Sequence, residues 1–166
     1  MAENNYTMLF SELLDKVHKA KTKEQKVQIL RENNTDSLRK FLKAAFDPKL
    51  KSIFPEGEVP YTPKEAPAGT EHTVLATEAR KLWHFIEGAD NVTKQHQKEN
   101  MFFQMLEGLH ESEAKLLVMA KDKKLHQHYK GLSSNVVKEA FDWDDNFLVV
   151  DNTYPQAAGL ASGADR

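Results

Sequence analysis

The segment from residue 100 to residue 141 constrains the fold of this chain more than any other part of it. Its apolar residues recur three or four positions apart in three successive runs, which is the spacing that lines one face of an α-helix. The runs are Phe102, Met105, Leu106 and Leu109; Leu116, Leu117 and Ala120; and Val136, Val137, Ala140 and Phe141. Ser112 is placed to cap the second helix, Gly131 supplies a positive-φ stop, and Ser133 or Ser134 restarts the chain. The segment therefore predicts three consecutive helices.

The same periodicity predicts further helices on the N-terminal side. One is expected over residues 7–20 and another over residues 73–86. The expected start signals of the others are the capping box formed by Thr22 and Gln25, Asp36, and Thr93. No alternation of apolar and polar residues persists, so we expect an all-α fold, with a single compact domain of about seven helices over residues 1–150.

A proline-rich stretch interrupts the helical pattern between residues 47 and 72. Five of the six prolines fall there, and proline removes a backbone donor and disfavours helix in the residue before it. The stretch also holds apolar residues that a free linker would not carry, namely Ile53, Phe54, Val59 and Tyr61. We therefore expect a strap that is pinned across the helices by these side chains, with a mobile linker as the alternative. Residues 151–166, rich in alanine and glycine, predict a flexible C-terminal tail.

Composition excludes several classes of protein. The chain has no cysteine, so disulfides and thiolate metal sites are excluded, and a reducing cytosol is the expected setting. No apolar leader follows Met1 and no apolar run reaches the length of a membrane span, so we expect neither secretion nor a membrane partner. The formal net charge of −2 argues against a protein that coats nucleic acid.

Two patterns suggest metal ligands, but neither is complete. Asp142 and Asp144 open a calcium-loop spacing that fails where Phe147 replaces the required glycine. Glu107 and His110 have the E-x-x-H spacing of di-iron bundles, but no second motif of this kind accompanies them, so we expect them on the helix exterior, capping at the turn. No cysteine nucleophile, nucleophile elbow or phosphate-binding glycine loop is present. We therefore expect no catalytic residue, no metal and no cofactor.

A basic run near residue 125 is a candidate contact surface. It consists of Lys121, Lys123, Lys124, His126, His128 and Lys130. His126 and His128 point apart on a helix, so they do not form a chelating pair. Residues 116–141 loosely match a helix-turn-helix, although Gln127 stands where that motif needs a small residue. The basic run therefore predicts a surface edge, and nucleic-acid binding through it is a weaker alternative.

Three stretches of this chain also resemble a known family. The most specific are the proline-rich stretch from Pro55 to Pro63, the LEGLHESEA turn and the KGLSSNVVKEAF ending. Together, residues 9–148 resemble a family of uncharacterised proteins of T4-like myoviruses, especially phages of marine bacteria. The resemblance implies a small phage-encoded protein that acts in an infected bacterium or is built into the virion. It implies no activity and no site residue.

The sequence thus predicts a non-enzymatic helical interaction protein that binds a phage or host protein. Its candidate surface combines the strap residues Phe54, Val59 and Tyr61 with the basic run. The alternatives are a structural component of the virion and an accessory protein that binds nucleic acid. The expected location is the bacterial cytoplasm or the particle, and the sequence predicts no oligomeric state.

Overall fold

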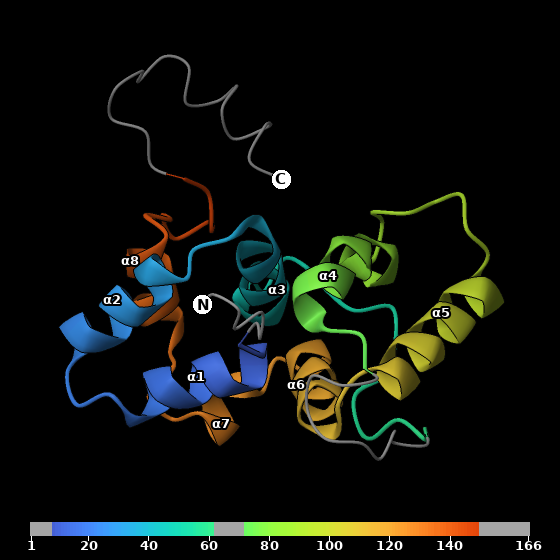
Figure 1. The fold of residues 1–166 in the computed structure, drawn as a ribbon. Helices are drawn as coiled ribbons and strands as arrows, with labels where there is room; N and C mark the ends of the chain where they lie inside the picture. Colours follow the sequence, from blue (N-terminus) through green and yellow to red (C-terminus); the bar gives the residue numbers. More distant parts are fainter. Residues whose placement is uncertain (1–7, 62–71, 150–166) are drawn as a thin grey trace.

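The computed structural model describes residues 8–61 and 72–149, and every regular element within these ranges is a helix (Figure 1). The elements are α1 (Phe10–Lys19), α2 (Lys23–Glu32), α3 (Asp36–Phe46), α4 (Leu75–Glu78), the 3-10 helix η1 (Ala79–Phe85), α5 (Gln95–Gly108), α6 (Glu111–Lys121), α7 (Leu125–His128) and α8 (Ser134–Ala140). The all-α prediction is confirmed. The predicted tail and the second part of the strap lie outside the described residues.

Two helices in the middle of the molecule connect its two ends (Figure 1). At one end, α2 packs against both α1 and α8; at the other, α5 packs against η1 and α6. α3 and α6 lie between these groups and contact each other, and the described helices share one continuous apolar core. None of the described helices has the length and apolar character that crossing a membrane requires.

The first three helices form where the apolar spacing predicts them. Leu14 and Val17 of α1 are fully buried, as are Leu38, Phe41 and Leu42 of α3. The capping box at the start of α2 is confirmed, because the Thr22 side chain accepts a hydrogen bond from the Gln25 backbone N–H. The cap of α3 is Thr35 rather than Asp36, because the Thr35 hydroxyl accepts from Leu38 N.

The helix predicted over residues 73–86 is wrong in kind. The α-helical part is a single turn, α4, and the chain then tightens into the seven-residue 3-10 helix η1. The helix ends at Phe85, and the chain there pairs with the strap: Ile53 N donates to Phe85 O, and Glu87 N donates to Lys51 O. These hydrogen bonds take backbone groups that a longer α-helix would have used internally.

Three predicted start and stop signals are also corrected. α5 begins after Lys94 rather than Thr93, and α6 is capped by His110 rather than Ser112. The His110 imidazole accepts from Ser112 N, which agrees with the capping role expected for it at the turn. Gly131 does not have a positive φ. It is required there by close approach, because a Cβ atom would lie 2.9 Å from the His18 carbonyl oxygen.

A buried acid holds three elements together. Glu113 of α6 is fully buried, and its two carboxylate oxygens accept from Phe10 N at 2.7 Å and Leu75 N at 3.0 Å. These N–H groups belong to the first residues of α1 and α4, which have no partner within their own helices. Burial raises the pKa of this carboxyl group, although the two backbone hydrogen bonds oppose the shift.

Candidate interaction surface

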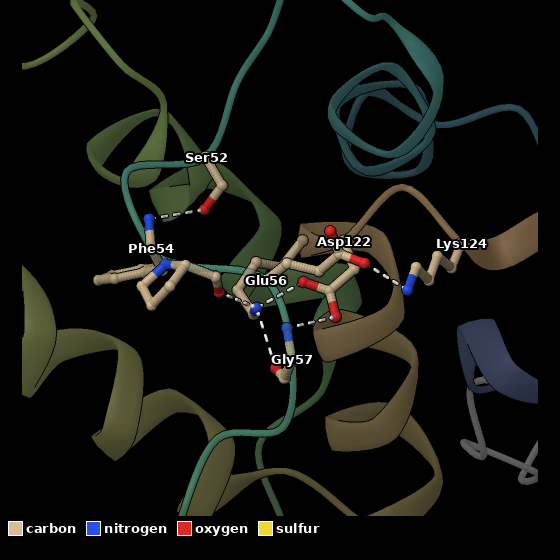
Figure 2. Close-up of polar contacts among 8 residues, drawn as sticks. Ser52, Phe54, Glu56, Gly57, Asp122 and Lys124 are labelled. Atoms are coloured by element: carbon tan, nitrogen blue, oxygen red, sulfur yellow. Dashed lines mark hydrogen bonds and ion pairs between the residues drawn. The ribbon is translucent and has the colours of Figure 1, made fainter.

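The described part of the strap, residues 47–61, is attached to the helices by its backbone first. Ser52 forms an isolated antiparallel bridge with Ile86, flanked by the hydrogen bonds of Lys51 and Ile53 already described. The Ser52 hydroxyl then accepts from Phe54 N at 3.1 Å, which turns the chain toward α5 (Figure 2). Backbone hydrogen bonds thus join the strap to the end of η1 and to the residues that follow it.

The aromatic ring of Phe54 provides the second attachment. Its centroid lies 4.5 Å from that of Phe102 in α5 and 5.5 Å from that of Phe85 in η1. Aromatic pairs at such distances contribute about 1 kcal/mol beyond the area that they bury. The sequence prediction that Phe54 pins the strap is therefore confirmed by its packing, and its side chain is half-buried.

Lys121 and Asp122 form a polar clamp on the next turn of the strap (Figure 2). The Lys121 ammonium donates to Pro55 O at 2.7 Å, to Gly57 O at 3.1 Å and to the Asp122 carboxylate at 2.6 Å. The second oxygen of Asp122 accepts from Gly57 N, so both peptide groups of Gly57 are bonded. Gly57 has a φ of +116°, which favours glycine at this position. The clamp therefore fixes the strap at its most sharply turned residue.

The next two lysines of the basic run also bind groups of this chain. Lys124 forms an ion pair with Glu56 of the strap, and this pairing raises the pKa of Lys124. Lys123 donates to the Ala44 carbonyl oxygen at 2.6 Å, near the C-terminal end of α3. Burial lowers the pKa of Lys123, and the charge of Asp47 opposes that shift. The three lysines nearest α6 thus hold the strap and α3.

The remaining members of the basic run are exposed. His126, His128 and Lys130 lie in or beside α7, whose four residues are too few for a recognition helix. α8 packs mainly against α2 rather than against α6, so α6 and α8 do not form the packed helix pair of a helix-turn-helix. Of these three exposed residues, His128 lies beside the described part of the strap.

A groove of about 790 Å³ separates the strap from α6 and α7, and we call it the strap groove. Its lining residues are Glu58, Val59, Tyr61, His110, Glu111, Ser112, Lys115, Val118, Met119, His128 and Tyr129. The structure thus brings three predicted site residues together in one hollow: Val59, Tyr61 and His128. Phe54 and Lys121 do not line this groove. They hold the strap through the ring contact of Phe54 with Phe102 and the hydrogen bonds of Lys121 to Pro55 O and Gly57 O.

The strap groove combines apolar and polar side chains. Val59 and Tyr61 are half-buried against the core, as are Val118 and Met119 of α6. Burial, and then the negative charge of Glu111, raise the pKa of Tyr61, so its hydroxyl stays protonated and can donate a hydrogen bond at neutral pH. The groove therefore combines an apolar floor with the Tyr61 hydroxyl as a hydrogen-bond donor.

The sequence reasoning missed the contribution of α6 to this groove. Val118 and Met119 lie off the buried stripe formed by Leu116, Leu117 and Ala120. Apolar residues in excess of those that the core needs were the available signal, because a helix buries only one face.

The metal patterns do not assemble into a site. Within the described residues, no group of three or more histidines, aspartates or glutamates is placed to hold a metal ion. Asp144 instead closes a turn, where it accepts from Asn146 N at 2.7 Å and Leu148 N at 3.2 Å. His110, as described, caps α6.

Comparison with known protein families gives a match. The family model described as a family of unknown function, DUF6433, matches residues 13–127, which run from most of α1 to most of α7 and include the whole strap. No curated protein and no solved structure matches the chain.

Proposed function

The chain belongs to the DUF6433 family of unknown function, and from this premise we propose that it is a non-enzymatic helical protein that docks a partner protein in the strap groove. The resemblance of residues 9–148 to proteins of T4-like myoviruses supports a phage-encoded origin. On this proposal the partner is a phage or host protein, met in the cytoplasm of the infected cell or in the particle.

One observation carries the proposal: the irregular strap is bonded to α6 through its backbone, while Val59 and Tyr61 stay half-buried and keep part of their apolar surface exposed in the groove. The Lys121 and Asp122 clamp fixes the backbone at Gly57, next to Val59 and Tyr61. A surface that is already ordered loses less conformational entropy on binding, so the same contacts give a higher affinity. If the strap is a recognition element, the clamp lowers the entropy cost of binding because it orders the strap in advance.

The basic run gives less support to nucleic-acid binding. Lys121, Lys123 and Lys124 bind groups of their own chain, so they are not available to neutralise phosphates without releasing the strap or α3. A protein partner is therefore the proposal that the geometry favours.

Site-specific photocrosslinking in infected cells tests the proposal. A photoreactive amino acid at position 59 should give one discrete crosslinked product, whereas the same amino acid at position 92 should give none. Val92 is the matched control because it is 92% exposed and is not among the described residues that line the groove. A Val59→Asp variant should lose the partner on affinity purification, and Val92→Asp should keep it. Equal crosslinking from both positions would contradict the proposal.

Mass spectrometry of purified particles separates a role in the virion from a role in the infected cell. If the partner is a virion protein, the particles will contain this chain at a fixed ratio to that partner. If the partner acts during infection only, the chain will remain in the lysate when particles are removed.

A further inference from the structure

A second groove, of about 610 Å³, lies on another face of the molecule between α3, η1 and the turn near residue 147. We call it the cationic groove. Its apolar lining residues are Ala44, Leu50, Ala79, Leu82, Trp83, Ile86, Ala89 and Leu148. Among residues 8–61 and 72–149, none lines both this groove and the strap groove, so we treat the two as separate sites.

Basic side chains surround this apolar floor. Lys40, Lys43, Lys49 and Arg80 line the groove, whereas Asp47 is the single acid among the lining residues that the structure describes. Asp47 is buried and accepts from Lys49 N, so its charge is turned into the protein. In a chain with a formal net charge of −2, this is a local concentration of positive charge. The groove therefore favours an anionic occupant.

The cations differ in how far they are engaged. Lys43 and Lys49 donate to the carbonyl oxygens of Phe147 and Asn146, and Lys40 pairs with Asp36 on the exposed face of α3. Arg80 is exposed, and within residues 8–61 and 72–149 its guanidinium has no ion-pair or hydrogen-bond partner. A guanidinium in this state can form a bidentate pair with an incoming carboxylate.

Trp83 is the feature that points to a macromolecular partner. It is 50% exposed, whereas Trp143, the other tryptophan, is buried. Its ring lies 3.9 Å from that of His84, and His84 is fixed by a 2.7 Å hydrogen bond to the buried carboxylate of Asp90. Tryptophan and arginine are the residues that most often dominate binding energy at protein interfaces. A tryptophan held in place beside an unpaired arginine has the composition of such a centre.

We propose that the cationic groove binds an acidic segment of a partner protein that inserts an apolar side chain against Trp83 and Leu82. A carboxylate of that segment would pair with Arg80, and the positive charges of Lys40, Lys43 and Lys49, which stay engaged by this chain, would attract the segment at longer range. The apolar floor favours a peptide over a nucleic acid, because a single-stranded nucleic acid needs successive aromatic platforms and Trp83 is the only aromatic residue among the described residues that line the groove.

The first test uses the full chain with Trp143→Phe, so that all tryptophan emission comes from Trp83. A short synthetic peptide that alternates glutamate with leucine should shift this emission to shorter wavelength and protect it from iodide quenching. A peptide with glutamine in place of glutamate should bind at least tenfold more weakly, and added salt should weaken the acidic peptide. Equal binding of the two peptides would overturn the proposal, as would tighter binding of a single-stranded oligonucleotide.

The second test compares variants by fluorescence anisotropy of the labelled acidic peptide. Trp83→Ala should weaken binding about 30-fold and Arg80→Glu about tenfold. Lys21→Glu is the control, because it makes the same change of charge at an exposed position outside the groove. A Lys21→Glu effect as large as that of Arg80→Glu would show that net charge alone is sensed, and would refute the site. Val59→Asp should leave peptide binding unchanged, so this test is independent of the strap groove.

Discussion

Two sets of basic side chains in this molecule have opposite roles. Lys121, Lys123 and Lys124 are adjacent in the sequence, yet they bind the strap and the end of α3. Lys49 and Arg80 are far apart in the sequence, yet both line an open groove. Lys49 also donates to the Asn146 carbonyl oxygen, whereas Arg80 has no ion-pair or hydrogen-bond partner within the described residues. A run of positive charge in a sequence therefore does not by itself identify a binding surface. Position in the fold decides whether a charge stabilises the chain or faces a partner.

The largest effect is expected for Glu113, a buried acid on α6, the helix that also carries Lys121. Glu113→Ala should lower the free energy of unfolding by about 4 kcal/mol, since two buried N–H groups lose their acceptor at about 1–3 kcal/mol each. Urea denaturation measures the change. The control is Glu111→Ala, which removes an exposed pair with Lys115 and should cost less than about 1 kcal/mol. Similar losses in both variants would show that the burial of Glu113 is not what matters.

The comparison itself is tested by making one substitution in each set. Lys121→Met should lower the free energy of unfolding by about 2 kcal/mol, because it leaves Asp122 and two strap carbonyl groups without their donor. Arg80→Met should change it by less than about 0.5 kcal/mol, as expected for an exposed side chain. Limited proteolysis should cut the strap faster in Lys121→Met alone. Equal stability of the two variants would remove the distinction between the sets.

A smaller effect is expected at the residue that the clamp holds. Gly57→Ala should cost about 1 kcal/mol, because a side chain is strained at a φ of +116° although space for a Cβ atom is available. Thermal unfolding detects such a change. Gly108→Ala is a useful companion because its φ is not positive and a Cβ there would meet only the Thr73 side chain. An unchanged Gly57→Ala melting temperature would mean that the strap adjusts at no cost.

The smallest effect is confined to acidic solution and concerns the support of Trp83. The hydrogen bond from His84, and then those from the backbone of Thr93 and Val92, hold the pKa of Asp90 well below its usual range. Its contribution to stability is thus present above a pH of about 4 and is lost as the pH falls toward the lowered pKa. The difference in stability between wild type and Asp90→Asn should be constant near neutrality and shrink below that pH. Asp145→Asn, at an exposed aspartate, should show a much weaker trend in the same urea titrations.

Helix positions could be predicted from the sequence because apolar spacing is a local property. The stripes on α3, α5 and α6 are buried as expected. Caps were less predictable, since Thr35 and Asp36 are both good caps and only the backbone geometry decides between them. The prediction for Gly131 was wrong because glycine is required there by close approach to His18, which lies 113 positions away. The His18 ring also accepts a hydrogen bond from Gly131 N. The grooves could not be predicted for the same reason. Arg80 and Leu148 are distant in the sequence and line the same groove only in the folded chain.

The carboxylate of Glu113 also bears on how this chain can vary in evolution. It serves the first turns of two helices that lie before it in the sequence, so neither helix can be deleted without leaving the acid buried beside a missing donor. A family member that had lost α1 or α4 would gain stability by replacing this glutamate with an apolar residue. Chain length and the residue at position 113 are therefore expected to change together across the family.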